Sequence, residues 1–358
     1  MSSLSIVLTV IFLILFALWL ISRLFLSVPN LRQFDQINVT MFESHPDEPA
    51  ARAALAVKMD DVRSSMKKTR SIKKALVIGR EYADNLSSDL QTESRIIPVN
   101  QDGIDAEWII APNADTKRRI VYFHGGAFIV GSARGHRNIT DKLAKLANAA
   151  VLSVNYRMSP EHSRPDGITD AQNAYQWILS NGPDGEQALD YLLVGGDSAG
   201  GNLALMISSW AKTTTRQADG VIGFSPLTDF GLTAPTMRAN QATDPILGEG
   251  LGYLVKIPLC MRNWISLIVT KINPASALAT PLLGDLKDLP PTLILASSSE
   301  MLLGDSVRYT NMANAAGSDV RLKIWKDQIH DWPLFFADGD VAADAWLKVD
   351  DFLKSLDA

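Results

Sequence analysis

The sequence has little of what several protein classes depend on. Its 358 residues include one cysteine, Cys260, so no internal disulfide can form. No group of cysteines and histidines has the spacing of zinc ligands, which excludes a zinc module. The 34 Lys and Arg against 39 Asp and Glu leave a formal net charge of −5, which removes the attraction that nucleic-acid binding needs. We therefore expect no metal, no cofactor and no nucleic-acid partner.

What remains is the composition of a folded globular chain. Hydrophobic residues make up 47% of the sequence and charged residues 20%, which is close to the globular average and excludes a disordered chain. Domains usually contain about 100–200 residues, so the length predicts two domains, or one large domain with an insertion.

One long hydrophobic run stands near the N-terminus. Residues 4–21 carry no charge, and as a helix they would extend about 27 Å at about 1.5 Å per residue, close to the thickness of a bilayer core. A cleaved signal peptide would place basic residues before a shorter apolar core and small residues after it. We therefore predict that residues 1–28 are a membrane anchor, with the lipid bilayer as partner of residues 4–21. A signal peptide and a buried helix are the alternatives.

Basic residues lie only on the C-terminal side of this run. Arg23 and Arg32 flank it, and the positive-inside rule then places the globular body in the cytoplasm. Residues 63–74 carry six more basic side chains. They indicate either a solvated helix face or a patch that contacts anionic lipid headgroups.

The rest of the chain predicts an α/β fold. Residues 96–99 and 107–110 flank a turn at 101–103, which is typical of an antiparallel hairpin. Short runs rich in β-branched residues then alternate with amphipathic stretches of helix length, which predicts a mostly parallel sheet covered by helices on both faces. These runs are residues 119–123, 150–154, 191–194, 221–224, 292–296 and 320–325.

One interval between these runs is too long for a simple crossover. The starts at Val221 and Thr292 are 71 residues apart, whereas a strand with its crossover helix takes about 30. We expect a helical insertion at about 230–285. Residues 29–92 also look helical, and with the insertion they would form a cap over one end of the main domain, residues 93–358.

A candidate nucleophile lies where a predicted strand meets a helix. Residues 196–200 form a G-x-S-x-G motif directly after the run at 191–194. The glycines permit a sharp turn that raises Ser198 Oγ above the sheet, and the following helix start offers amides to a developing anion. The alternative is a plain glycine-rich helix entry.

A nucleophilic serine needs a base and an acid, which follow it in the order Ser, Asp or Glu, His. Of the five histidines only His330 follows Ser198, so it is the candidate general base. Ten carboxylates lie between the two, and Glu300 alone comes directly off the end of a predicted strand. Glu300 is the candidate acid. Asp305 is the second choice, and a helix-capping role at the surface is the other interpretation of Glu300.

A second glycine-rich loop follows the run at 119–123. In the sequence HGGAF at 124–128, Gly125 and Gly126 can present backbone amides to a substrate oxygen. With the amide of Ala199 they would form a three-donor oxyanion hole, as acyl transfer requires. The alternative is a loop that only closes a tight turn. We expect His124 to hold this loop by hydrogen bonding.

Four segments together resemble the hormone-sensitive-lipase family of α/β-hydrolases. They are HGGAF at 124–128, YRMSPEH at 156–162, GDSAGGNL at 196–203, and the stretch from SSSEMLLGDS to QIHDW at 297–332. The resemblance implies an α/β-hydrolase fold with a helical cap. It also implies Ser198 as nucleophile, His330 as base and Glu300 as acid. Ala127 stands where the family has the third glycine of HGGG, which narrows the alcohol or acyl side of the pocket.

The resemblance implies a serine carboxylic ester hydrolase that acts on short- to medium-chain apolar esters through an acyl-enzyme on Ser198. Two alternatives stay open: an amide hydrolase or deacetylase with the same triad, and a non-catalytic ligand receptor on the same fold, against which the presence of His330 argues. The anchor is similar to that of the arylacetamide-deacetylase branch, whose catalytic domain faces the lumen. That similarity favours the orientation opposite to the one predicted from Arg23 and Arg32. The sequence predicts no oligomeric state.

Overall fold

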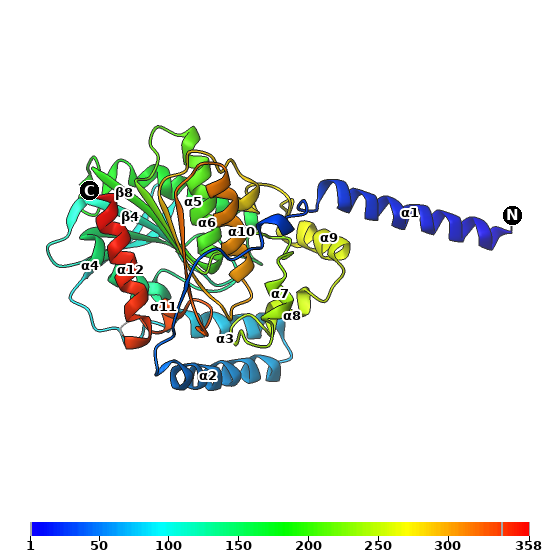
Figure 1. Ribbon diagram of the computed structural model, residues 1–358, viewed down its shortest axis with the longest axis horizontal. Coiled ribbons are helices and arrows are strands. Elements are labelled where there is room, and N and C mark those ends of the chain that lie inside the picture. Colours follow the sequence, from blue (N-terminus) through cyan, green and yellow to red (C-terminus); the bar gives the residue numbers. More distant parts are fainter. Residues whose placement is uncertain (1, 338, 358) are drawn as a thin grey trace.

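The computed structural model describes residues 2–337 and 339–357. Its centre is a sheet with helices around it (Figure 1). The sheet has nine strands in the order β1-β11-β10-β9-β8-β4-β5-β3-β2. All neighbouring strands are parallel except in the pairs β2–β3 and β3–β5. The strands are β1 (Met41–Phe42), β2 (Arg95–Gln101), β3 (Ile104–Ile110), β4 (Asp115–Phe123), β5 (Ala149–Val154), β8 (Tyr191–Asp197), β9 (Gly220–Phe224), β10 (Thr292–Ser297) and β11 (Val320–Trp325).

The six predicted apolar runs coincide with β4, β5, β8, β9, β10 and β11. Strands β8 and β10 are buried along their whole length. A strand that is covered on both faces needs apolar residues at every position, so it appears in the sequence as a continuous run. The predicted hairpin is β2–β3. Its two-residue turn, Asp102 and Gly103, has positive φ at both positions, which matches the twist of the strands.

Helices cover both faces of the sheet, each over its own apolar core. On one face lie α5 (Arg164–Ile178), α6 (Ser198–Trp210) and α10 (Leu303–Ala315), whose side chains share one core cluster. On the other lie α4 (Arg137–Ala147) and α12 (Asp340–Leu356), which pack with the short α11 (Trp332–Phe335). This is the α/β architecture that the sequence predicts.

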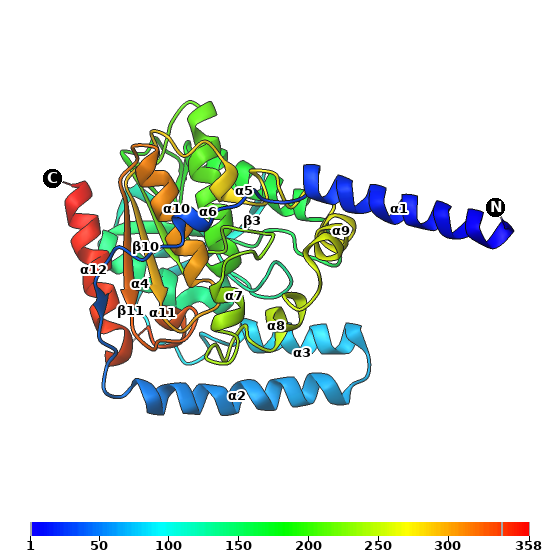
Figure 2. The same ribbon diagram turned by 45° about the vertical axis from the view of Figure 1, so that its right-hand side comes forward.

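The N-terminal segment is helical over only part of its predicted length. Helices α2 (Glu48–Lys68) and α3 (Ile72–Asp84) lie side by side (Figure 2). The prediction of helix is wrong for most of residues 29–47, which contain one 3-10 turn (Arg32–Phe34) and edge strand β1 beside β11. It is also wrong for residues 85–92, which form turns and a loop. Asn311 donates to the carbonyls of Phe34 and Gln36 in this stretch, and Arg308 binds Asp35. These contacts fix the turn and the residues directly after it against α10.

Helix α2 contacts the insertion after β9. This insertion contains α7 (Thr236–Ala239), α8 (Gly250–Leu254) and α9 (Leu259–Thr270). From α2, Arg52 donates to the Thr243 carbonyl at 3.3 Å and Lys67 pairs with Glu249 at 3.3 Å. Arg63, the first residue of the basic stretch, donates to the Pro245 carbonyl. The two segments that the sequence predicts as a cap therefore touch each other.

The first helix, α1 (Ser3–Phe25), projects from the body (Figure 1). Within the described residues it is the one helix long and apolar enough to cross a membrane, and none of its most apolar stretch is buried. Only its C-terminal end contacts the body. Ser22 and the following Leu26 are buried there.

Candidate active site

Ser198 is the first residue of α6 and directly follows β8. Its backbone is in the left-handed region, with φ of 49°, and its side chain is nearly buried. Such a sharp strand-to-helix turn holds a side chain above the sheet edge. A Cβ on Gly200 would collide with the backbone of Phe123 and His124 at the end of β4. Glycine at position 200 therefore lets the start of α6 approach the loop after β4.

The three residues predicted as a triad lie in one hydrogen-bonded chain. His330 Nε2 is 2.9 Å from Ser198 Oγ, and His330 Nδ1 is 2.7 Å from Glu300 Oε2. The other oxygen of Glu300 accepts the Ser297 amide at 2.8 Å, which fixes the carboxylate. In the neutral ring, Nδ1–H donates to Glu300 and Nε2 is left as the acceptor that faces the serine hydroxyl.

Of the two candidate acids, Glu300 alone contacts the histidine. Asp305 lies in the first turn of α10, where its carboxyl accepts the amides of Thr228 and Asp229 at 2.7 and 2.8 Å. Burial, with the negative charge of Asp229, raises the pKa of Asp305 well above its usual value. Asp305 therefore holds the loop after β9. The interpretation of Glu300 as a surface helix cap is wrong, because Glu300 is fully buried.

A second carboxyl group beside His330 escaped the sequence analysis. Asp331 Oδ2 lies 3.0 Å from His330 Nε2, on the nitrogen that faces Ser198. Asp331 has φ of 55°, and its amide donates to Ser225 Oγ at 3.2 Å. Burial raises its pKa to about 7. Asp331 directly follows His330 in the segment QIHDW, but nothing in the sequence shows that the two side chains turn toward each other.

These charges set the protonation of the histidine. Burial by itself lowers the pKa of His330, because a charged ring loses its hydration. The negative charges and hydrogen bonding of Asp331 and Glu300 act in the opposite direction and together outweigh burial, so the pKa of His330 lies well above 6.5. The ring therefore keeps its proton to a higher pH than an ordinary histidine.

The predicted oxyanion loop has an unusual backbone. Gly126 has φ of 108°, and the next two residues, Ala127 and Phe128, have φ of 54° and 62°. The Gly126 carbonyl accepts the amides of Ile129 and Val130, both at 3.0 Å, which closes the loop tightly. The loop therefore closes a tight turn, and this geometry is compatible with the predicted role in anion binding.

Three amides at this loop and at the start of α6 are available to a ligand. Within residues 2–337 and 339–357, the amides of Gly125, Gly126 and Ala199 have no hydrogen-bond partner in the protein. The amide of Ala199 is in the first turn of α6, where helix geometry supplies no acceptor. The arrangement can therefore offer donors to an anion near Ser198.

His124 supports this loop from behind. Its Nδ1 is 2.7 Å from the Gly125 carbonyl, and its ring stacks on Tyr156 with 4.4 Å between centroids. Burial lowers the pKa of His124 to about 3, so the ring is neutral and Nδ1–H donates. This position agrees with the predicted role of His124 in holding the loop.

Asp197, which precedes the nucleophile, is held by two buried side chains. Tyr122 donates its hydroxyl to Asp197 Oδ1 at 2.7 Å, and His136 Nε2 is 3.3 Å from Oδ2. Burial raises the pKa of Asp197, but the positive charge and hydrogen bond of His136, with the hydrogen bond from Tyr122, together outweigh burial, and the net shift is downward. A fixed carboxylate at this position stabilises the turn that carries Ser198.

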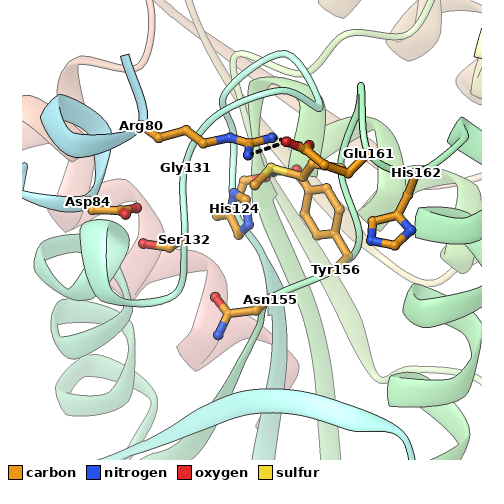
Figure 3. A pocket seen from close by; sticks show the side chains of 10 residues that line it. Arg80, Asp84, His124, Gly131, Ser132, Asn155, Tyr156, Glu161 and His162 are labelled. Carbon is orange, nitrogen blue, oxygen red and sulfur yellow. Dashed lines mark hydrogen bonds and ion pairs between the residues drawn. The ribbon is translucent and has the colours of Figure 1, made fainter. Parts of the chain in front are cut away.

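A cavity of about 370 Å³ lies behind the oxyanion loop (Figure 3). Figure 3 shows the ion pair of Arg80 with Glu161, 2.7 Å long, above His124. Arg80, from α3, also donates to the carbonyls of Ile129 at 2.9 Å and Ser159 at 3.0 Å. The cavity is lined by Arg80, Asp84, His124, Gly131, Ser132, Asn155, Tyr156, Met158, Glu161 and His162. Through Arg80, helix α3 is thus tied to the residues that follow the oxyanion loop.

Comparison with known sequences points to the same chemistry. A family model described as the alpha/beta hydrolase fold matches residues 120–334. An esterase of Acinetobacter venetianus is 32% identical over 265 residues, which cover 74% of this chain and 83% of that protein. Esterase LipU of Mycobacterium tuberculosis is 30% identical over 227 residues, which cover 62% of this chain and 73% of that protein.

Solved structures agree with the sequence comparison. An esterase/lipase from an uncultured bacterium superposes with a TM-score of 0.68 at 28% identity, over 78% of this chain and 91% of that chain. An esterase from the bacterial hormone-sensitive lipase family gives a TM-score of 0.67 at 27% identity, over 83% of this chain and 96% of that chain.

Proposed function

Because the chain belongs to the hormone-sensitive-lipase family of α/β-hydrolases and is an enzyme of the esterase and lipase type, we propose that it hydrolyses carboxylic esters through an acyl-enzyme on Ser198. The observation that carries the proposal is the unbroken chain of contacts from Glu300 through His330 to Ser198. A nucleophile, a base and a group that orients the base are what covalent acyl transfer requires.

In the first half of the reaction, Ser198 Oγ attacks the ester carbonyl carbon while its proton moves to His330 Nε2. The carbonyl oxygen becomes an anion, which the amides of Gly125, Gly126 and Ala199 stabilise. The intermediate collapses by breaking the carbon–oxygen bond to the alcohol, and His330 returns the proton to the leaving oxygen. The alcohol departs and the acyl group stays on Ser198.

In the second half, water replaces the alcohol. His330 takes a proton from water as the water oxygen attacks the acyl carbon, and the same amides bind the second oxyanion. Collapse breaks the bond to Ser198 Oγ, which regains a proton from His330. Glu300 stays ionised throughout and stabilises the imidazolium that forms twice in each cycle.

We propose short- to medium-chain apolar esters as substrates. Ala127, in place of a third glycine, adds a methyl group beside the oxyanion loop. Phe128 follows it, with its ring 6.1 Å from that of Phe230 in the insertion and under the guanidinium of Arg164. These apolar groups favour an apolar acyl or alcohol group.

We also propose that α1 anchors the enzyme in a membrane and that α2 and α3 form a cap with the insertion at 230–285. The anchor rests on the length and exposure of α1. The cap rests on the contacts between α2 and residues 243–249.

Arg23 and Arg32 favour a cytoplasmic body. Protease added outside sealed cells would spare a cytoplasmic body and would digest one on the opposite side.

The substrate proposal is tested with p-nitrophenyl esters from acetate to palmitate, together with an acyl anilide of the preferred length. We expect the highest kcat/KM in the short to medium range and slower anilide cleavage. Ser198→Ala should remove activity on every substrate, whereas the matched control Ser209→Ala, at the other end of α6, should keep it. Faster cleavage of the anilide would favour the amidase alternative. Ligand binding without turnover would favour a receptor.

A further inference from the structure

Helix α9 has an exposed face without a polar residue. Its exposed side chains are all apolar, while Arg262 and Asn263 on the same helix are buried against the body. A soluble surface helix normally presents charged side chains to water. The exposed residues of α9 are Leu259, Met261, Ile265, Ile268 and Val269, of which Ile268 and Val269 are 71% and 64% exposed. These apolar side chains face water, although an apolar environment would suit them better.

Helix α9 lies against the C-terminal part of α1. Trp264 Nε1 donates to the Leu18 carbonyl at 3.1 Å, and Ser22 Oγ donates to the Cys260 carbonyl at 3.4 Å. Figures 1 and 2 both show α9 beside the body end of α1. These contacts join α9 to the last two turns of a helix whose remaining length is free.

The position of these contacts along α1 sets the depth at which α9 would lie in a bilayer that α1 spans. The apolar run ends at Ile21, and Arg23 is the first charged side chain after it. From Leu18 to Phe25 the helix rises about 10 Å. If α1 spans a bilayer, this stretch lies at the boundary between the acyl chains and the headgroups, which is the depth that interfacial amphipathic helices occupy.

The joint between α1 and the body is also fixed. Asn273 donates to the Phe25 carbonyl at 2.8 Å, one of the carbonyls that a helix end leaves without a partner. Asn263 donates to Ser27 Oγ at 3.0 Å. With these bonds at the end of α1, the body does not turn freely about the anchor, so α9 keeps its place relative to the bilayer.

We propose that α9 is a second membrane contact, lying in the lipid–water interface with Leu259, Met261, Ile265, Ile268 and Val269 among the acyl chains. The proposal rests on the proposed anchoring role of α1. Lys256 and Lys271 are exposed on either side of α9 and can reach headgroup phosphates. Helix α9 belongs to the insertion that contacts α2. The contact of α9 with lipid therefore turns the proposed cap toward the bilayer. Esters dissolved in the membrane are then the substrates nearest to the cap.

The test places a fluorescent reporter on this face in the full-length protein. Cys260→Ala removes the native thiol and keeps the backbone carbonyl that Ser22 uses. In this background, Ile268→Cys and the control Leu347→Cys are labelled with an environment-sensitive dye. Leu347 is 59% exposed on α12, at the end of the molecule opposite α1 (Figure 1). Both proteins are reconstituted into phosphatidylcholine vesicles, with and without lipids that carry a nitroxide high on the acyl chain.

We expect the nitroxide lipids to remove most of the fluorescence at position 268 and little at position 347. Retained esterase activity in both variants shows that they are folded. Protein that stays in the vesicles after a carbonate wash, with equal quenching at both positions, would overturn the α9 contact and leave the anchor intact. Release by carbonate would overturn both. Self-quenching at position 268 without quenching by lipid would instead mean that a second copy of the chain covers this face.

Discussion

Asp331 Oδ2 and Ser198 Oγ both lie within hydrogen-bonding distance of one ring nitrogen, His330 Nε2, at 3.0 and 2.9 Å. Glu300 occupies the other ring nitrogen at 2.7 Å. A protonated His330 therefore has a carboxylate within ion-pair distance of each of its nitrogens. A base that is stabilised in this way in its protonated form is harder to regenerate as a neutral acceptor for the serine proton.

The first prediction concerns pH. His330 must be neutral to accept a proton, and its pKa is raised, so kcat/KM should increase with pH through a midpoint above 6.5. Asp331→Asn removes the negative charge with the larger influence on this pKa. The pKa of His330 should then fall, and the rising limb should move to lower pH. The measurement is kcat/KM for a water-soluble ester as a function of pH.

Other charged groups near Asp331 stay in place in this variant. The charged groups are Asp197, Glu300 and His136, and the neutral Tyr122 hydroxyl lies beside Asp197. Asp327→Asn is the matched control, because Asp327 is exposed in the same loop and shares the left-handed backbone that asparagine tolerates. A rising limb that stays in place or moves to higher pH in Asp331→Asn would show that Asp331 does not govern the base.

The second prediction concerns the oxyanion loop. Ala127→Gly replaces a left-handed alanine, relieving about 1–2 kcal/mol of strain. Glycine also costs about 0.5–1 kcal/mol of chain entropy. Stability should therefore change little or rise slightly, with kcat maintained, as thermal unfolding and ester turnover would record.

Gly126→Ala is the contrasting variant. Its φ of 108° excludes most side chains, and an added Cβ would collide with the Val130 carbonyl. We expect a displaced amide donor and a kcat lower by about 10²-fold or more, with little change in KM. A large increase in KM at normal kcat would instead identify the loop as a surface that only binds substrate.

The third prediction separates the two buried carboxyls. Glu300→Gln should lower kcat by several orders of magnitude, because a neutral amide no longer stabilises the imidazolium of His330. Asp305→Asn should mainly lower stability, because Asp305 accepts the amides of Thr228 and Asp229 and is not a hydrogen-bond partner of His330. Both variants need kcat and a denaturation curve. The acid assignment is wrong if Asp305→Asn abolishes turnover in a folded protein while Glu300→Gln is mild.

The fourth prediction concerns the anchor. Ser22 and Leu26 are buried against the body, so the end of α1 also contributes to packing. Deletion of residues 1–21 keeps both and should yield a soluble esterase. Deletion of residues 1–28 should also be soluble, with a lower unfolding temperature. Full-length protein should resist carbonate extraction. Extraction of the full-length protein by carbonate would contradict the anchoring role of α1. An insoluble protein after deletion of residues 1–21 would show that these residues are also needed for folding.

The strands and the proposed triad could be predicted because the sequence constrains them strongly. Strands such as β8 and β10 are buried on both faces and have no alternative to apolar residues. The order of Ser198, an acid and a histidine leaves only His330 as the base. Both signals are local or depend on the order of the chain alone.

What was missed depends on contacts between distant or unusually turned residues. Strand β1 has two residues and exists only because it pairs with β11, far along the chain. The place of Asp331 depends on its positive φ, which turns its carboxylate toward the neighbouring ring. Asp305 and Glu300 both follow β10 closely, and only the fold shows that Asp305 turns toward the loop after β9.

The most direct test of the proposed mechanism is to trap the acyl-enzyme. Full-length enzyme is mixed with p-nitrophenyl butyrate and quenched in acid, and the peptide that contains Ser198 is examined by mass spectrometry. We predict a butyryl group on Ser198, absent in Ser198→Ala and formed orders of magnitude more slowly in His330→Ala. Ester turnover that persists in Ser198→Ala, or a butyryl group on another residue of the active wild-type enzyme, would contradict the account.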